Sequence, residues 1–117
     1  MADQAIFIAY TPFSGVPVVR LMPRTWKHHI TEPREGHPEL VGKEHLLQTT
    51  LECPTAVYSN NGDNEYVVFS NNTIVNVRGS PLAVIVSPEA QIVVTSYYER
   101  RLVNPDVNGY IQIWQPA

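Results

Sequence analysis

The sequence predicts an α+β fold, with two helices of the N-terminal half packed on one face of a mainly antiparallel β-sheet. Before Pro54, apolar residues recur at helical spacing, and after Pro54 the apolar period changes to two. The segments between the later apolar runs have turn composition at hairpin lengths, which joins neighbouring strands antiparallel. Helices and strands that are segregated along a chain are typical of α+β domains.

The composition predicts one folded domain over residues 1–117. Hydrophobic residues make up 44% of the chain and charged residues 16%, which excludes a disordered chain. The net charge of −3 gives no general attraction for nucleic acid, but Arg20 to Lys43 holds five of the eight Lys and Arg residues. Cys53 is the single cysteine, the N-terminus lacks a basic leader, and no apolar run reaches membrane length. We therefore expect a cytoplasmic protein without a membrane anchor.

The first half of the chain alternates short apolar runs with proline and glycine. Pro23 is expected to end the second strand, and Thr25 is a good N-cap residue for a short helix that places Trp26, His29 and Ile30 on one face. Pro38 suits the first turn of a second helix, which Pro54 ends. The expected elements are strands at 5–10 and 16–22, a helix at about 24–32, a loop at 32–36 and a helix at 38–53.

The second half reads as a run of strands separated by turn residues. In the segment 91–98, alternation puts Thr95 and Tyr97 on one face with Val93, and Ser96 and Tyr98 on the other with Val94, and either face can meet the helices. The expected strands are Thr55–Ser59, Glu65–Ser70, Thr73–Arg78, Leu82–Ser87, Gln91–Tyr98 and Tyr110–Trp114. The expected core includes Leu47, Leu51, Val68, Val84, Val86 and Val94.

The segment Arg24–Pro38, R-T-W-K-H-H-I-T-E-P-R-E-G-H-P, holds three of the four histidines among basic residues. Imidazole and guanidinium groups a few residues apart can transfer protons and stabilise a phosphate without a metal. The alternative is the solvated charged face of a surface helix. The histidine spacings match no zinc motif, and there is no glycine-rich phosphate loop, so we expect no metal and no other cofactor.

The segment Gln91–Arg101, Q-I-V-V-T-S-Y-Y-E-R-R, combines hydroxyl groups, aromatic rings and an arginine doublet. Aromatic stacking together with arginine is a common way to bind single-stranded RNA. The alternative is cross-strand packing beside a charged sheet edge.

Taken in order, these segments resemble the small phage- and toxin-associated branch of the barnase/EndoU/colicin/RelE-like nuclease superfamily. The resemblance lies in H-I followed by H-P-E, a helix that closes in T-L-E-C-P, and a strand that ends in T-S-Y, and it spans about Thr25 to Tyr98. Thr73–Pro81 looks like an insertion between two strands of that pattern. The resemblance implies an α+β ribonuclease-toxin-like domain whose catalytic residues are His29, His37, Thr95 and Tyr97.

The function predicted from this resemblance is a metal-independent endoribonuclease in which the 2′-hydroxyl of RNA attacks the phosphodiester. His29 or His37 is the base, and the other histidine or Tyr97 is the acid. Arg34, with Arg100 or Lys27, stabilises the phosphate, and Thr95 binds a phosphate oxygen or positions an imidazole. The expected partners are RNA and an antitoxin or immunity protein. The alternative is a non-catalytic relative that binds protein or nucleic acid through exposed aromatic residues, Tyr58, Tyr66, Tyr97, Tyr98 and Trp114.

Overall fold

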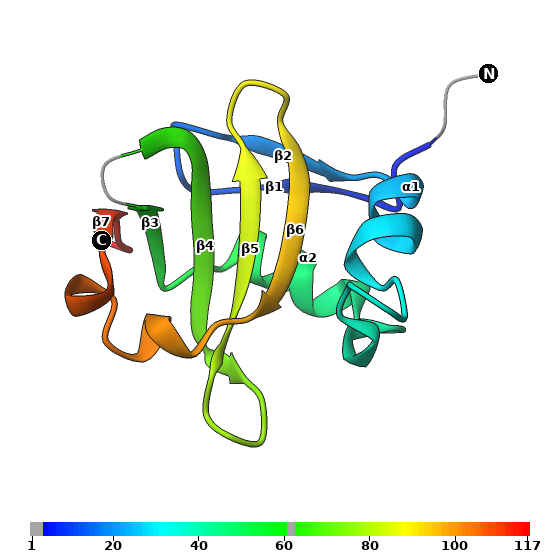
Figure 1. The fold of residues 1–117 in the computed structure, drawn as a ribbon. Coiled ribbons are helices and arrows are strands. Elements are labelled where there is room, and N and C mark those ends of the chain that lie inside the picture. The colour runs from blue at the N-terminus through cyan, green and yellow to red at the C-terminus, as the bar shows by residue number, and fades with distance from the viewer. Residues whose placement is uncertain (1–3, 61–62) are drawn as a thin grey trace.

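The computed structural model describes residues 4–60 and 63–117, and within them it confirms the α+β class (Figure 1). The main helix, α2 (Glu44–Glu52), contacts β1, β4 and β5 on one face of a sheet of seven strands in this described part. In Figure 1, α2 and the first two strands lie behind β4, β5 and β6. The strands are β1 (Phe7–Tyr10), β2 (Val18–Leu21), β3 (Ala56–Asn60), β4 (Asp63–Val75), β5 (Pro81–Ser87), β6 (Ile92–Tyr98) and β7 (Tyr110–Trp114).

The sheet has the order β1-β2-β6-β5-β4-β3-β7. The β3–β4, β4–β5 and β5–β6 pairs are antiparallel neighbours in sequence, as the hairpin-length turns predicted. β7 pairs antiparallel with β3 at one edge, and β1 pairs antiparallel with β2 at the other. β2 meets β6 in parallel, through the pair Arg20 and Ile92. The sheet is therefore mainly antiparallel, with one parallel junction.

The first helix begins one residue earlier than predicted and changes its winding. Pro23 occupies the first turn of α1 (Pro23–Thr25), where a backbone N–H would have no partner within the helix, so its absence costs nothing. Because the helix starts at Pro23, Thr25 is inside it and does not cap it. A π-helical turn, η1 (Trp26–Ile30), follows and closes with a bond from the Thr31 N–H to the Trp26 carbonyl. Wider winding turns His29 to solvent while Ile30 is buried, so the expected shared face of Trp26, His29 and Ile30 is wrong.

The predicted second helix at 38–53 is divided in two. Pro38 opens only a 3-10 turn, η2 (Pro38–Leu40), and α2 begins at Glu44. Between them Gly42 has φ +78°, a left-handed conformation that no continuing helix allows and that glycine adopts without strain. The divided segment still buries an apolar stripe of Leu40, Leu47 and Leu51 against the sheet, and two of these, Leu47 and Leu51, are predicted core residues.

The two strands predicted at Glu65–Ser70 and Thr73–Arg78 are one strand, β4, and Asn71-Asn72 is not a hairpin turn. The Asn71 side-chain amide donates to the Cys53 carbonyl at 2.7 Å, and its Oδ1 accepts from the Thr73 N–H and hydroxyl. These local bonds shift the pairing with β5 between Asn71 and Val75 without reversing the chain. The segment predicted as an insertion is the end of β4 and its loop to β5. The turn expected between Ser59 and Glu65 includes residues 61–62, which lie outside the described residues.

Five of the six predicted core residues are buried, four of them between α2 and the sheet. Leu47, Leu51, Val84 and Val86 are fully buried there, and Val68 is buried on the opposite face. Val94 is only half-buried, so its assignment to the core is wrong. A β-bulge shifts the β5–β6 register so that Val86 faces Val93 while Ile85 faces Thr95, which turns Val94 away from the helix side.

The face of the sheet opposite α2 has a much smaller apolar cluster of Val68, Ala83, Leu102 and Tyr110. Two 3-10 turns that periodicity did not predict, η3 (Arg100–Val103) and η4 (Asp106–Asn108), connect β6 to β7. Most of this face is consequently not covered by a helix. No helix in the described ranges is long and apolar enough to cross a membrane.

Candidate functional site

The candidate site lies on the open face of β6. Thr95 and Tyr97 share this face, as alternation predicted, because their sheet partners Ile85 and Ala83 lie opposite them on β5. Val93, which alternation placed with them, lies on the helix side instead. Because the bulge adds Val94 to the same side, three residues of one strand meet here. They line a hollow of about 330 Å³, called the Tyr97 hollow below. Its lining is Asn60, Tyr66, Val68, Ile85, Val94, Thr95, Tyr97, Arg101 and Tyr110.

His37 is brought to Tyr97 from the other half of the domain. The two rings are stacked, with centroids 5.3 Å apart and an angle of 28° between their planes. The sequence separates them by sixty positions, so this contact depends on the packing of the His37 loop against the end of β6. His37 and Tyr97 are both half-exposed, and a ligand can therefore reach either ring.

The loop that carries His37 is folded tightly onto the preceding helix. The Glu32 carboxylate accepts the N–H groups of Arg34 and Glu35, at 2.9 and 2.6 Å, and these bonds lower the pKa of Glu32. A Cβ at Gly36 would lie 2.6–2.7 Å from the carbonyl oxygens of His29, Ile30 and Glu32, so only glycine fits. The loop backbone therefore fixes the position from which His37 approaches Tyr97.

Glu39 completes the surroundings of His37. Its Oε1 lies 3.4 Å from His37 Nδ1, and both side chains are partly exposed. A carboxylate at this distance favours the tautomer that carries its proton on Nδ1, which leaves Nε2 as an acceptor. The Nδ1 side of the imidazole thus faces Glu39.

An arginine is held beside Tyr97 by a buried carboxylate. Glu99 is 8% exposed, and its two oxygens accept from Arg101 Nε and Nη2 at 3.1 and 2.9 Å. Arg101 itself is 56% exposed and stacks over Tyr110 at 5.8 Å, so the guanidinium is fixed yet keeps donors for a ligand. The hydrogen bond from Arg101, more than its charge, lowers the pKa of Glu99, and the carboxylate stays ionised.

Burial, and then the nearby charge of Glu99, raise the pKa of both Tyr97 and Tyr110 above the usual phenol value. Both phenols are therefore protonated at neutral pH and can donate a hydrogen bond. Arg101 opposes part of the shift at each tyrosine. The Tyr97 hollow thus offers phenol donors and a positioned guanidinium, and an imidazole stacks on one of its phenol rings.

The other predicted site residues do not meet this group. His29 is exposed on η1, and Arg34 is exposed on the loop. Lys27 lines a separate shallow hollow with Pro23, Arg24 and His28. Arg100 borders a further hollow with Arg101, Val103, Asn104 and Asn108. Thr95 and Tyr97 line the Tyr97 hollow, and His37 stacks on Tyr97 without lining the hollow itself. None of the other four predicted residues lines it, namely His29, Lys27, Arg34 and Arg100.

Sequence reasoning missed Glu99, Arg101 and Tyr110. The arginine doublet was noted, but alternation cannot say which arginine faces the site, because β6 ends at Tyr98 and a 3-10 turn follows. One feature of the sequence could have indicated Arg101, namely Glu99 two residues before it. The Glu99 side chain caps the 3-10 turn by accepting the Arg101 N–H, and this brings the two side chains together. Tyr110 could only be found through the β3–β7 pairing.

Within the described residues, no group of three or more His, Cys, Asp or Glu side chains is arranged to hold a metal ion. Comparison with protein-family models, with curated proteins and with solved structures finds no match for this chain. The resemblance to the nuclease superfamily therefore remains an expectation from the sequence.

Proposed function

We propose that the protein is a metal-independent endoribonuclease that cleaves RNA by attack of the 2′-hydroxyl on the adjacent phosphate. The observation that carries this proposal is the stack of His37 on Tyr97, beside a guanidinium that Glu99 holds in place. RNA supplies its own nucleophile, so the protein needs only a base, an acid and positive charge around one phosphate. Tyr97 and Arg101 line the Tyr97 hollow, and His37 stacks on Tyr97, which supports the proposal.

His37 is the proposed base. Its Nδ1 faces Glu39, which leaves Nε2 to take the proton of the 2′-hydroxyl, and imidazole exchanges protons near neutral pH without a large change of its surroundings. As the proton leaves, the 2′-oxygen forms its bond to phosphorus, and the bond to the 5′-oxygen of the next nucleotide breaks. The product is a 2′,3′-cyclic phosphate and a free 5′-hydroxyl.

Tyr97 and Arg101 are the proposed acid and phosphate ligand. Tyr97 keeps its proton at neutral pH and can give it to the leaving 5′-oxygen, while Arg101 donates to the phosphate oxygens on which charge builds. Thr95 adds a hydroxyl on the same face. His29, Lys27, Arg34 and Arg100 then have the lesser role of contacts to other parts of the RNA. This chemistry is the basis for expecting a cytoplasmic enzyme with an antitoxin or immunity protein as partner.

The test is incubation of the purified protein with single-stranded RNA in the presence of EDTA, followed by analysis of the product ends. We expect cleavage to survive EDTA, because each proposed step uses side chains alone, and to leave 2′,3′-cyclic phosphates. RNA with 2′-deoxy or 2′-O-methyl riboses should remain intact. Products with a 3′-hydroxyl, or activity that EDTA abolishes, would rule out this mechanism.

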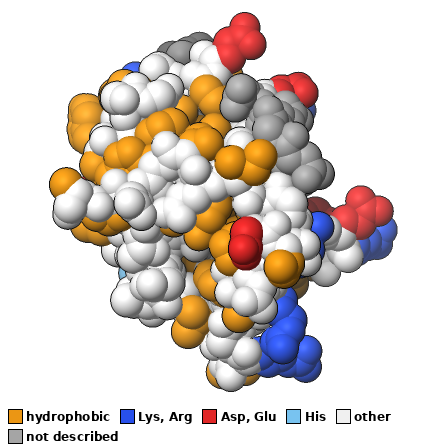
Figure 2. All heavy atoms as spheres, turned by 90° about the vertical axis from the view of Figure 1, so that its left-hand side faces the viewer, with side chains coloured by type: hydrophobic (Ala, Val, Ile, Leu, Met, Phe, Trp, Pro, Cys, Tyr) orange, Lys and Arg blue, Asp and Glu red, His pale blue; other side chains and the backbone are white. Residues whose placement is uncertain are grey.

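A second candidate function, a non-catalytic binding module, is favoured by the β7 edge of the sheet. Ile111 is 51% exposed and Ile113 39% exposed on this edge strand. Figure 2, which looks onto this side of the molecule, shows hydrophobic side chains spread over it with few charged groups among them. If wild-type protein leaves RNA intact in the assay above, while the substitution Ile113→Lys abolishes binding of a protein partner, the binding module is the better description.

A further inference from the structure

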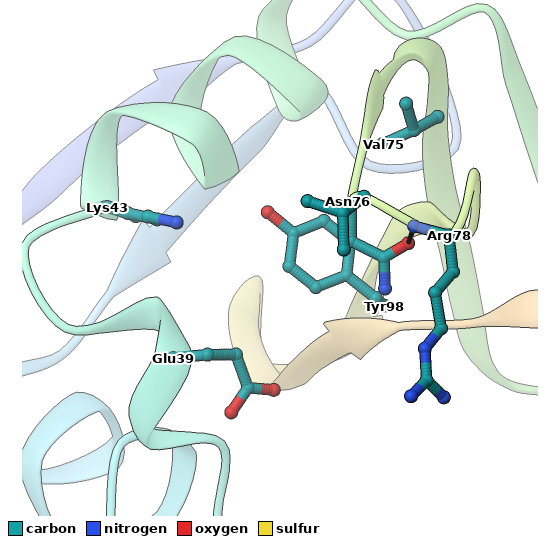
Figure 3. A pocket seen from close by; sticks show the side chains of 7 residues that line it. Glu39, Lys43, Val75, Asn76, Arg78 and Tyr98 are labelled. Carbon is teal, nitrogen blue, oxygen red and sulfur yellow. Dashed lines mark hydrogen bonds between the residues drawn. The ribbon is translucent and has the colours of Figure 1, made fainter.

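A second hollow, of about 690 Å³, lies on the helix side of β6, directly behind Tyr97. Tyr98 stands on its inner side, and the segment at 39–43 and the loop between β4 and β5 form two walls (Figure 3). We call it the Tyr98 hollow. Its volume lies within the range of roughly 300–1,000 Å³ that is usual for small-molecule sites. Its lining is Glu39, Lys43, Val75, Asn76, Arg78 and Tyr98, together with Val77.

The β4–β5 loop is held in one shape before any ligand arrives. The Asn76 Oδ1 accepts the N–H groups of Arg78 and Ser80 at 3.0 and 2.9 Å, and its backbone N–H donates to the Ser80 carbonyl. Gly79 supplies the left-handed residue, with φ +79°, that this tight loop requires. Arg78 is therefore presented by a rigid wall, and ordering the loop costs little when a ligand binds.

The charges of this hollow favour an anion. Lys43 and Arg78 stand on opposite walls, against the one carboxylate of Glu39. In Figure 3 the Arg78 side chain extends along its wall, away from Lys43. In Figure 3 the Lys43 ammonium and the Tyr98 hydroxyl point toward one another across the opening. Val77 at the loop tip is fully exposed and Val75 is 43% exposed, so apolar surface adjoins the cations. A nucleotide, with a phosphate and a flat apolar base, has this combination of chemistry.

Glu39 connects the Tyr98 hollow to the surroundings of His37. One side of this residue lies 3.4 Å from His37 Nδ1, and the same side chain lines the hollow. Tyr97 and Tyr98 are neighbours on β6 that project to opposite faces of the sheet. An RNA strand that crosses the end of β6 past His37 would therefore pass from one hollow to the other.

We propose that the Tyr98 hollow binds the nucleotide next to the one cleaved at His37, with Lys43 and Arg78 pairing with its phosphate. This inference rests on the proposed ribonuclease function and adds a second binding subsite to it. It also gives a role to the β4–β5 loop, which contributes nothing to the Tyr97 hollow.

The test measures binding separately from cleavage. A short, fluorescently labelled single-stranded RNA with 2′-O-methyl riboses has no free 2′-hydroxyl, so its anisotropy reports binding alone. Lys43→Ala and Arg78→Ala should each raise the Kd about tenfold, since each removes a charged contact to phosphate. Each should also reduce the dependence of log Kd on log salt by about 0.7, the value for one phosphate of a single strand. Arg20→Ala is the matched control, because it removes an exposed positive charge on β2, away from both hollows.

The cleavage assay supplies the second measurement. With unmodified RNA, Lys43→Ala should lower kcat/KM about tenfold and leave kcat at saturating RNA unchanged, because the contact is equal in the ground and transition states. Wild-type cleavage with unchanged Kd in both variants overturns the subsite and leaves the proposed function intact. Binding that depends on Lys43 and Arg78 without any cleavage overturns the ribonuclease and supports the hollow as an RNA site. The labelled RNA can also be displaced by competitors. If inorganic phosphate displaces it as effectively as a mononucleotide does, the hollow does not recognise a nucleotide and that assignment is overturned.

Discussion

The two faces of β6 have similar residue types but different surroundings. The face toward α2 packs Val93 against a cluster that includes Leu47, Leu51 and Val84, all fully buried. The open face places Thr95 and Tyr97 beside an ionised carboxylate and a guanidinium, over a cluster of only a few apolar residues. The same strand therefore has two roles. Its helix side stabilises the fold, and its open side is free to carry polar groups that a core would not tolerate.

The bulge in β6 determines which of its residues lie on each face. Without it, strict alternation would put Val93 on the same side as Thr95, away from α2. With it, Val93 joins the core and Val94 joins Thr95 at the Tyr97 hollow. A single extra residue therefore adjusts the strand so that its first half fits the helix and its second half presents the candidate site.

The largest effect should come from the helix side. Leu47→Ala removes a fully buried side chain from the core, and we expect a loss of about 2–5 kcal/mol in the free energy of unfolding. Denaturant unfolding measures it, and the exposed neighbour Thr49→Ala on the same helix should change it by less than about 0.5 kcal/mol. Equal effects from the two substitutions would mean that α2 does not organise the core.

The next effect should separate the open face from the core. His37→Ala should lower RNA cleavage by about 10²-fold or more, because it removes the proposed base, while the Tm stays nearly unchanged for a half-exposed side chain. His45→Ala, an exposed histidine on α2, is the control and should retain wild-type activity. If His29→Ala proves more damaging than His37→Ala, the base lies on η1 and our placement of the site is wrong.

A smaller effect is expected from the Tyr97 hydroxyl. Tyr97→Phe keeps the ring that stacks on His37 but loses the proton donor, so kcat should fall about tenfold, the equivalent of one hydrogen bond to a charged group. Steady-state kinetics with unmodified RNA measures the fall. Tyr10→Phe on β1, where the tyrosine is 68% exposed, should not alter kcat. A wild-type kcat for Tyr97→Phe would assign the acid to another group.

The smallest effect concerns acid stability on the open face. The pKa of Glu99 is lowered in the folded protein, so its ion pair stabilises the fold above the unfolded value of about 4.5 and is lost as the pH falls through the folded pKa. Glu99→Gln lacks this contribution. The Tm difference between wild type and Glu99→Gln should therefore shrink as the pH is lowered below about 4.5. A difference that stays constant with pH would show that the charge of Glu99 contributes nothing.

The fold class could be predicted because it depends on local patterns. The change of period at Pro54 and the stripe of Leu40, Leu47 and Leu51 were sufficient for the α+β class and for the helix face that meets the sheet. The bounds of individual elements were predicted less well, because of one glycine and one asparagine. Gly42 interrupts a helix that periodicity alone would continue, and Asn71 makes a bulge where the same residue type often makes a turn, because its side chain bonds to the backbone in both.

The candidate site was less predictable because its contacts join distant segments. Residue type alone selected His37 and Tyr97, yet nothing in their local sequence indicates that the two rings are stacked. The same limit explains why Arg100 was preferred to Arg101, since the choice depends on the turn that follows β6 and on the buried Glu99. His28 and His29 lie on η1, which contacts β6, but their side chains are exposed to solvent.

The parallel junction of β2 with β6 has a consequence for how the domain opens. The β1–β2 hairpin is joined to the rest of the sheet by the pair Arg20 and Ile92 and a bond from the Arg20 N–H to the Gln91 carbonyl. Its remaining attachment is the burial of Phe7, Val19 and Leu21 against the helix side. In native-state hydrogen exchange, the amides of β1 and β2 should therefore exchange through partial openings well below the global free energy of unfolding. Those of β5 and the middle of β6 should exchange only with global unfolding, so the hairpin can detach transiently while Thr95 and Tyr97 keep their places.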